Sequence, residues 1–367
     1  MKAQKFFYEL INEPPLILES TKQQQHITLP AEWAEQDAVL IAWPHPDTDW
    51  NYMLNEVEAC YLNIAEAISS HENLIIATPH PHEVSRKLEH LPHRNRITMV
   101  EVATNDTWAR DFGVITATID GAPVAYDFKF NGWGLKFASD KDNLINRALK
   151  HNGVLAAKLV NRMGFVLEGG SIESDGNGTI MTTANCLLSP NRNGEMSRQE
   201  IEDYLKQQFG AKQVLWVDHG ELMGDDTDSH IDTLARFVPG NTIVYTRCQD
   251  STDCHHAELE MMHDQISTFA NAYGEPYRTV TLPLPKPIFD EDGLRLPATY
   301  ANFLITNQCV LVPTYNQPDL DRRALEALQA AVPSRKVVGI DCCALIKQHG
   351  SLHCVTMQLP KGSTNLR

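Results

Sequence analysis

Short apolar runs that end at turn residues recur along the chain, and stretches with a helical spacing of apolar side chains lie between them. Residues 38–43 read AVLIAW and residues 73–78 read NLIIAT, each followed by proline, which predicts two buried strands. Residues 55–69 and 319–331 carry apolar side chains at helical intervals, which predicts amphipathic helices. This alternation indicates an α/β protein.

Four segments share the plan of a hairpin, in which a polar residue precedes a strand, a turn and an apolar returning strand. The turns fall at residues 120–123, 175–178, 239–241 and 307–308. The polar residues that open these segments are Asp111, which we expect to begin its strand, Glu168, His230 together with Asp232, and Asn302.

The opening residues are separated by about 50 to 75 positions, close to one fifth of the 367-residue chain, which predicts repeated ββαβ units. Repeats of this size usually close into a ring, propeller or barrel whose central face collects one residue from each unit. An open mixed α/β sheet, in which the polar residues merely begin strands, fits the spacing equally well. The periodicity leaves both architectures open.

Composition and charge narrow the function classes. Hydrophobic residues make up 43% and charged residues 21% of the chain, as in globular proteins of one large domain or two smaller ones. The formal net charge of -16 argues against a nucleic-acid partner, because such binding depends on Lys and Arg neutralising phosphates. An acidic field instead favours a small cation, such as a polyamine or a guanidinium compound.

Neither a signal-length apolar run near residue 1 nor a stretch of about 20 apolar residues is present, so no membrane association is expected. The eight cysteines are irregularly spaced, which does not resemble a disulfide framework. We therefore expect a cytoplasmic protein, and a homo-oligomer, most simply a dimer, as is common for soluble enzymes. The proline-rich segment 282–297 is either a lid or a long connection.

Cys354, in the sequence GSLHCVT at residues 350–356, is a candidate nucleophile. A cysteine in an apolar setting is more often a small buried hydrophobic residue, but the polar neighbours of Cys354 favour a thiol that a protonated histidine or a cationic substrate activates. His230 follows the acidic turn 224–229, which we expect to raise its pKa and keep it protonated for acid catalysis. That turn does not match a calcium loop.

Asp111 and Glu168 lie among apolar neighbours, where an unpaired charge is costly. One explanation is an ion pair with Arg110 or Arg236. The other is that these carboxylates, together with Asp232, hold a planar guanidinium through charge-assisted hydrogen bonds. No cysteine or histidine spacing fits a standard zinc motif, so we expect neither a metal nor a cofactor.

Several separated motifs together resemble the agmatine deiminases of the guanidino-group-modifying superfamily, which are related to bacterial peptidylarginine deiminases. The motifs are EWAEQDA at 32–38, WARDFG at 108–113, EGGSIE at 168–173, LSPNRN at 188–193, DTDSHID at 226–232 and LHCVT at 352–356. The resemblance implies a five-bladed α/β propeller, the pentein fold, in a single catalytic domain over 1–367, with 1–30 as an extension packed on it.

The resemblance also implies roles for individual residues. Cys354 corresponds to the nucleophile, His230 to the general acid and base, and Asp111 and Asp232 to guanidinium ligands. The implied substrate-contacting residues are Glu168, Trp108 and Asp228, and Asn302 is a further candidate from its place in the fourth hairpin.

The implied reaction is hydrolysis of agmatine to N-carbamoylputrescine and ammonia through a covalent thiouronium on Cys354, a step toward putrescine in polyamine metabolism. Deimination of arginine or peptidyl-arginine shares this chemistry. An acidic cavity wall facing the far end of the substrate would favour agmatine. An arginine side chain of the protein at that place would instead favour a substrate that carries a carboxylate, such as arginine. A non-catalytic protein that binds polyamines or guanidinium compounds is the alternative outside the enzymes.

Overall fold

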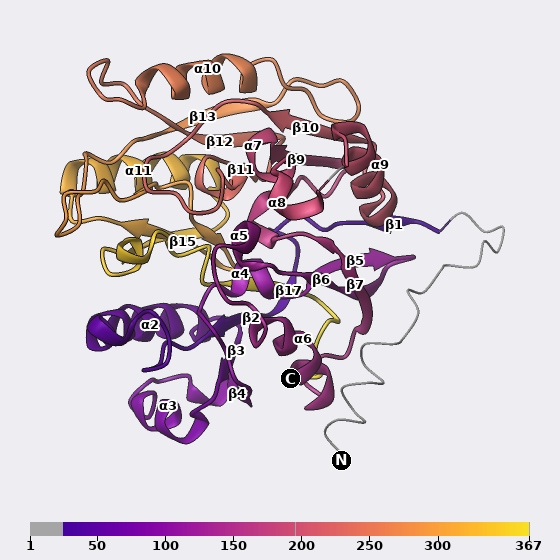
Figure 1. Ribbon diagram of the computed structural model, residues 1–367, viewed down its shortest axis with the longest axis vertical. Coiled ribbons are helices and arrows are strands. Elements are labelled where there is room, and N and C mark those ends of the chain that lie inside the picture. Colours follow the sequence, from indigo (N-terminus) through magenta and orange to yellow (C-terminus); the bar gives the residue numbers. More distant parts are fainter. Residues whose placement is uncertain (1–24, 195, 367) are drawn as a thin grey trace.

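Five separate sheets of three or four strands make up the β-structure of the chain (Figure 1). This computed structural model describes residues 25–194 and 196–366. Each sheet contains an antiparallel pair and continues with a parallel strand. Helices connect the parallel strands, since such pairs need a crossover. The strands therefore follow the ββαβ plan in a mixed α/β fold, and they do not form the single open sheet that the spacing also allowed.

One sheet joins the two ends of the described chain. Its parallel strands are β2 (Gln36–Ala42), β3 (Asn73–Thr78) and β4 (Ile97–Glu101), with α2 (Leu54–Ser69) and α3 (Pro81–Lys87) as crossovers. The antiparallel partner of β2 is β17 (Met357–Pro360), from the far end of the sequence, and Figure 1 shows both near the middle of the molecule. A fifth hairpin equivalent is thus built from segments more than three hundred residues apart, and the hairpin pattern did not predict it.

The other four sheets are local in sequence, apart from the short strand β1 in the second. The second contains β1 (Ile27–Thr28), β5 (Ile115–Ile119), β6 (Ala122–Lys129), β7 (Lys158–Val166) and the crossover helix α6 (Ile145–His151). The third contains β8 (Ile172–Ser174), β9 (Thr179–Thr183), α9 (Arg198–Phe209) and β10 (Gln213–Val217). The fourth contains β11 (Ala235–Val238), β12 (Thr242–Arg247), α10 (His256–Ile266) and β13 (Arg278–Pro283). The fifth contains β14 (Leu304–Ile305), β15 (Cys309–Thr314), α11 (Pro318–Ala331) and β16 (Lys336–Asp341).

The predicted strands β2 and β3, the predicted helices α2 and α11, and the four predicted hairpins are confirmed. The prediction that Asp111 begins a strand is wrong, because it lies in the single helical turn α4 (Ala109–Phe112) and β5 starts at Ile115. The backbone N–H of Gly113 donates to the carbonyl of Ala109, which closes that turn and delays the strand.

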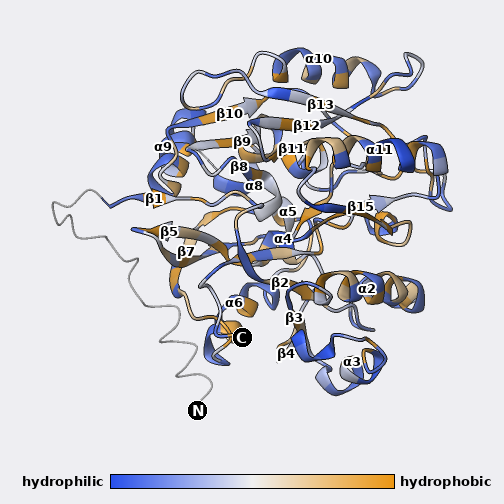
Figure 2. Cartoon of the chain, turned by 180° about the vertical axis from the view of Figure 1, so that it is seen from behind, coloured by the Kyte–Doolittle hydropathy of each residue, from blue (hydrophilic) through white to orange (hydrophobic). Residues whose placement is uncertain are grey.

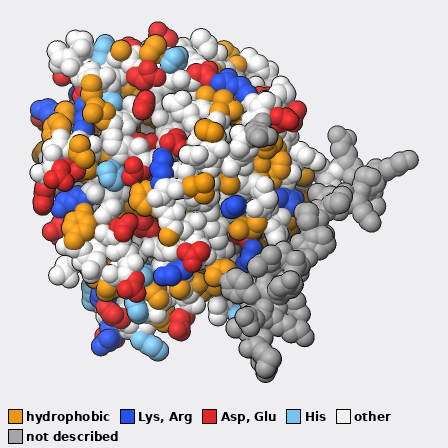
Figure 3. Space-filling model, in the orientation of Figure 1, with side chains coloured by type: hydrophobic (Ala, Val, Ile, Leu, Met, Phe, Trp, Pro, Cys, Tyr) orange, Lys and Arg blue, Asp and Glu red, His pale blue; other side chains and the backbone are white. Residues whose placement is uncertain are grey.

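The buried apolar side chains form one large cluster through the strands and the inner faces of the helices, and a second, smaller cluster that includes Phe237 of β11, Ile243 of β12 and Met262 of α10. Residues 38–42 of β2 are fully buried, as expected for a strand covered on both faces. Figure 2 shows hydrophobic and hydrophilic positions alternating around α2 and α11, so each helix packs one face on a sheet. Acidic and basic side chains are interspersed over the face drawn in Figure 3.

The predicted extension at 1–30 lies mostly outside the described residues, which begin at residue 25. Its described end forms β1, which pairs antiparallel with β5 through Ile27 and Thr28. All eight cysteines are free thiols. Within residues 25–194 and 196–366, no helix combines the length and apolarity needed to cross a membrane.

Candidate active site

The residues that precede the first strand of each hairpin supply the candidate site. They come from α4, from the segments around η4 (Gly169–Ser171) and η5 (Ile231–Thr233), and from the turns before β14 and β17. In chain order these residues are Asp111, Glu168, His230, Asp232, Asn302 and Cys354.

Three of these side chains converge on one glycine. A Cβ atom on Gly170 would lie 2.7 Å from His230 Nδ1, 2.9 Å from Asp111 Oδ1 and 3.0 Å from Asp232 Oδ2. Any larger residue at this position would push the three groups apart. Gly170 therefore lets an imidazole and two carboxylates from three different elements share one buried space.

A cavity of about 150 Å³ opens beside this space. Cys354, Asp111 and Trp108 line it, and Cys354 is only 4% exposed. Trp108 lies against the backbone of Gly350, where a Cβ would come within 2.2 Å of the indole ring. The predicted nucleophile, a predicted guanidinium ligand and the predicted wall therefore face the same cavity.

Asn302 connects the sulfur to its surroundings. Its Nδ2 donates to Cys354 Sγ at 3.2 Å and lies 3.4 Å from the carbonyl oxygen of Asp232. Burial, followed by the charges of Asp232 and Asp111, raises the pKa of the Cys354 thiol well above its ordinary value. A cation held by these carboxylates would oppose their effect and favour the thiolate.

Asp111 is held in place by two donors. Its Oδ2 accepts from Trp133 Nε1 at 2.9 Å, and its Oδ1 accepts from the backbone N–H of Gly170 at 3.0 Å. Burial raises the pKa of Asp111 to about 6 although the charge of His230 opposes the rise. Asp111 therefore carries a negative charge at neutral pH without the arginine partner that we considered for it.

Asp232 has one oxygen engaged and one available. Its Oδ2 lies 2.6 Å from His353 Nδ1, whereas its buried Oδ1 has no hydrogen-bond partner within residues 25–194 and 196–366. Burial would raise the pKa of Asp232, but His353 and His230 lower it below its usual value. This combination gives a charged, buried oxygen that is suited to accept from a ligand N–H.

His230 is fully buried and lies 3.6 Å from Asp111 Oδ1 through its Nδ1 atom. Burial alone would lower its pKa, but Asp111, the Cys186 sulfur and Glu168 raise it to about 10. This direction agrees with the protonation predicted for His230, whereas its predicted source, the acidic turn, is wrong. Asp225 of that turn instead accepts from Thr227 Oγ1 and from the backbone N–H of residue 229, both at 2.6 Å.

Two predicted substrate contacts are tied to other residues of the chain. Arg192 Nε lies 3.0 Å from both oxygens of Glu168, and both side chains are fully buried. Arg192 Nη1 lies 2.6 Å from Asp228, which also pairs with Lys136 at 2.8 Å. The ion pair that we considered for Glu168 exists, but its partner is Arg192 and not Arg110 or Arg236.

Sequence reasoning missed several residues of the cavity. Trp133 takes the left-handed conformation, with φ 54° and ψ 50°, between two glycines that also have positive φ. A tryptophan between glycines is a signal for an unusual backbone, and its strain is typical of functional sites.

The far wall of the cavity is acidic. Asp49, Asp106 and Asp226 line it together with Asp111, and no Lys or Arg is among the described lining residues. Burial and the neighbouring Asp49 raise the pKa of Asp106 to about 7, and burial also raises the pKa of Asp226. Crowded carboxylates of this kind favour a cationic ligand.

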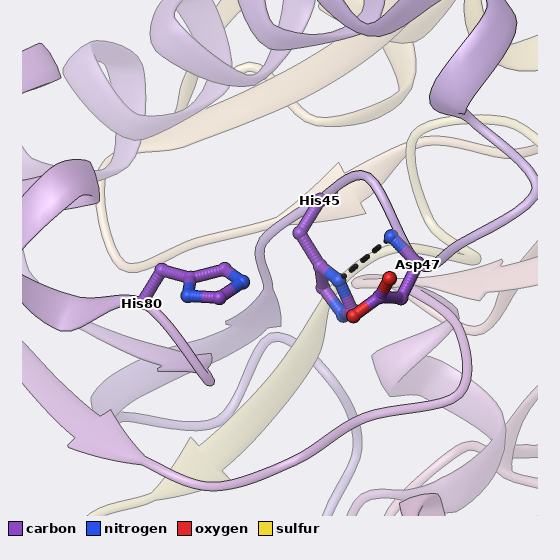
Figure 4. Close-up of side chains that lie close together, drawn as sticks. All are labelled: His45, Asp47 and His80. Carbon is purple, nitrogen blue, oxygen red and sulfur yellow. Dashed lines mark hydrogen bonds between the residues drawn. The ribbon is translucent and has the colours of Figure 1, made fainter.

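His45, Asp47 and His80 form one group of potential metal ligands, at the ends of β2 and β3 (Figure 4). The His45 ring is already engaged, because Nε2 lies 2.9 Å from Thr104 Oγ1 and Nδ1 accepts from the backbone N–H of Asp47 at 3.3 Å. The contact with Thr104 fastens the loop after β2 to the loop after β4, and we assign His45 to that role.

The three other potential metal groups in the described chain each contain an anion already paired with an arginine. The pairs are Glu168 with Arg192, Glu173 with Arg236, and Asp253 with Arg295. A guanidinium thus already supplies the positive charge that a metal ion would bring.

Comparisons with known proteins agree with this arrangement. A family model described as Porphyromonas-type peptidyl-arginine deiminase matches residues 28–360. A curated relative from Shewanella sp. (strain MR-7), provisionally named agmatine deiminase, is 32% identical over 374 residues, which cover 94% of this chain and 97% of the relative.

Two solved structures are similar along nearly the whole chain. A structure from Porphyromonas gingivalis, provisionally titled arginine deiminase, is 50% identical with a TM-score of 0.88 and covers 93% of this chain and 100% of its own. A cysteine-to-serine variant of the C. jejuni agmatine deiminase with substrate bound is 36% identical with a TM-score of 0.86, covering 93% of this chain and 98% of its own.

Proposed function

The chain belongs to the Porphyromonas-type peptidyl-arginine deiminase family, and from this we propose that it hydrolyses agmatine to N-carbamoylputrescine and ammonia. The observation that carries the proposal is the convergence of Asp111, His230 and Asp232 on Gly170, beside the cavity that Cys354 lines. A thiol, an imidazolium and two carboxylates are the groups that guanidinium hydrolysis needs, and relatives named agmatine deiminases support the assignment.

Substrate binding prepares the nucleophile. The guanidinium places N–H groups against Asp111 and against the available Oδ1 of Asp232, so that its central carbon faces Cys354 Sγ. Its positive charge offsets the two carboxylates that raise the pKa of Cys354, and the thiol proton leaves to solvent. The cavity therefore generates the thiolate only when the reacting cation is present.

The thiolate then attacks the guanidinium carbon and forms a C–S bond. His230, as an imidazolium, gives a proton to the departing nitrogen, the C–N bond breaks, and ammonia leaves a cationic thiouronium on Cys354. Neutral His230 next takes a proton from water, and the resulting hydroxide adds to the same carbon. The C–S bond breaks, the hydroxyl proton passes to sulfur, and the ureido product leaves with the enzyme restored.

The acidic wall distinguishes agmatine from arginine. Asp49, Asp106 and Asp226 line the same cavity as Cys354 and Asp111, and we propose that the far end of a bound guanidinium compound extends toward them. A terminal ammonium complements these carboxylates, whereas an α-carboxylate is repelled by them. We propose agmatine as the substrate on this basis.

An ammonia-release assay across agmatine, arginine and arginyl peptides tests the proposal. We expect the highest kcat/KM for agmatine. Higher kcat/KM for arginine or a peptide would overturn the substrate assignment and keep the chemistry. Mass spectrometry of protein quenched during turnover should detect an adduct on Cys354, and its absence together with tight agmatine binding would identify a non-catalytic binding protein.

We also propose that the five sheets are blades of one closed propeller and one catalytic domain, with the cavity at their common axis. The shared blade plan and the placement of at least one site residue before each hairpin support this closure. We propose that the protein forms a homodimer, which light scattering on the purified chain tests directly. A monomer at all concentrations would overturn that assignment.

A further inference from the structure

A buried set of charged side chains lies behind Cys354, and the mechanism above does not use it. Its members are Glu32, Arg110, Glu173, Arg236 and His353, each no more than 7% exposed. Charges this deep are costly unless they are paired and hydrogen-bonded. The set reaches the active site through His353, which is bonded to Asp232 and precedes the nucleophile in sequence.

The His353 ring lies between two carboxylates. Its Nδ1 lies 2.6 Å from Asp232 Oδ2 and its Nε2 lies 2.6 Å from Glu32 Oε2. Burial would raise the pKa of Glu32, but Arg236 and His353 lower it well below its usual value, and the pKa of Asp232 is lowered as well. A carboxylate that carries its charge only accepts hydrogen bonds, so both contacts are satisfied when both ring nitrogens donate.

Glu32 is itself fixed from several sides. Its Oε1 accepts from the backbone N–H of Ile305 at 2.7 Å, and its Oε2 accepts from Arg236 Nη2 at 2.8 Å. Arg236 is anchored in turn by Glu173 and by the carbonyl oxygen of Phe303. Glu32 therefore presents a charged oxygen to His353 at a defined place.

The backbone of His353 connects the same residue to the nucleophile. Its N–H donates to Asn302 Oδ1 at 2.9 Å, and Asn302 Nδ2 donates to Cys354 Sγ at 3.2 Å. The ring of His353 thus engages Oδ2 of Asp232 and leaves the buried Oδ1 without a partner, while its main chain places the sulfur. One residue sets the relative position of the attacking atom and the group that holds the electrophile.

We propose that His353 is a positioning residue, an imidazolium fixed by Glu32 that orients Asp232 toward the guanidinium of the substrate. His353 does not contact the reacting atoms in this proposal, and it acts through Asp232. The kinetic part of the test rests on the proposed deiminase function, whereas the protonation of the ring can be measured without any activity.

The first measurement is NMR of free protein labelled with ¹⁵N-histidine at pH 7. We expect two slowly exchanging, strongly downfield ring N–H protons that disappear together in His353→Gln. In Glu32→Gln the neutral amide no longer requires a second proton on the ring, so at least one of these signals should weaken or move. A ring with a single N–H in the wild-type protein would overturn the proposal.

The second measurement is the pH profile of kcat/KM for agmatine. Losing a hydrogen bond to a charged group should lower kcat/KM of His353→Gln by about 10- to 100-fold. Without the imidazolium the pKa of Asp232 rises, so the acid limb should move to higher pH and steepen. His255→Gln is the matched control, because His255 is also buried and bonded to a carboxylate, Asp253, and should keep the wild-type profile.

The double variant Glu32→Gln, His353→Gln separates positioning from general damage. Glu32 acts only through His353 in this proposal, so the loss in the double variant should be smaller than the product of the two single losses. The proposal would be contradicted if the loss of kcat/KM in the double variant equalled the product of the two single losses, or if His353→Gln kept the wild-type pH profile. If His353→Gln does not fold, Glu32→Gln and the NMR measurement still test the positioning role of His353. Absence of ammonia release by the wild-type protein would refute the proposed deiminase function instead.

Discussion

Trp133→Phe removes one donor to Asp111 together with part of a ring that lines the cavity. The indole N–H donates to Asp111 Oδ2 at 2.9 Å, and the two side chains are 6% and 3% exposed. The Trp133 ring also packs edge-on against Phe130 and Phe137, with centroids 4.9 and 5.5 Å away, and a phenyl ring can keep these contacts. Phenylalanine also bears the same left-handed backbone cost, so the pH dependence of the defect reports the lost hydrogen bond.

The structure sets the size of the effect. A hydrogen bond to a charged group contributes about 1.5 to 3 kcal/mol, which corresponds to a loss in kcat/KM of about 10- to 150-fold. The Trp133 hydrogen bond lowers the pKa of Asp111, which is about 6, so its removal moves that pKa upward. Above pH 6 the wild-type carboxylate is charged while the variant remains partly protonated, and the defect should shrink as the pH rises.

The assay is ammonia release from agmatine by wild type, Trp133→Phe and Trp216→Phe. It covers about pH 5.5 to about pH 9, which includes the titration of Asp111 and the ordinary titration of histidine. Trp216 is the control, because its indole also donates to a carboxylate, Glu202 at 3.2 Å, but it does not line the cavity. Unchanged kcat/KM in Trp133→Phe would refute the role of this bond in holding Asp111. A loss of equal size at every pH would mean that Trp133 acts only as a wall.

Three further measurements test the site and its energetics. Cys354→Ser should release no ammonia yet bind agmatine and unfold at the wild-type temperature, and any turnover near the wild-type rate would remove Cys354 as the nucleophile. Because the pKa of Asp106 is about 7, kcat/KM for agmatine should rise as this carboxylate becomes charged through pH 7, and Asp106→Asn should lose that rise. If an alkylguanidine without an amine shows the same rise, Asp106 does not bind the terminal amine. Burial raises the pKa of Glu72 from 4.5 to about 7. The folded protein therefore loses stability as pH rises between these two values, and the free energy of unfolding is about 3 kcal/mol lower once pH exceeds 7. Glu72→Gln should therefore be more stable than wild type at pH 8 and equal to it near pH 4.5, and equal denaturant midpoints at both pH values would contradict this.

Local patterns predicted most of the fold. Apolar runs and turn residues identified β2, β3, α2 and the four hairpins because each depends on neighbours in sequence. The pairing of β17 with β2 has no local signal, since hydrogen bonds between the chain ends carry no pattern in either segment alone.

The candidate site was predictable where one residue marks each hairpin. Asp111 and Asn302 follow that rule, whereas Cys354 was predicted from its polar neighbours, and the structure brings the three together. The partners of these residues were not predictable, because Arg192 reaches Glu168 and Glu32 reaches His353 only after the sheets have packed. Whether a buried carboxylate is available to a ligand depends on such distant cations.

The pairing of β17 with β2 also concerns how the polypeptide matures. During synthesis β2 leaves the ribosome early, and its fully buried residues 38–42 must wait for residues 357–360 before that edge is covered. An uncovered apolar edge strand recruits other strands and promotes aggregation. A nascent or truncated chain that stops before residue 350 therefore lacks Cys354 and also leaves the apolar edge of β2 unpaired. Such an edge is a feature by which chaperones and proteases can recognise unfinished molecules.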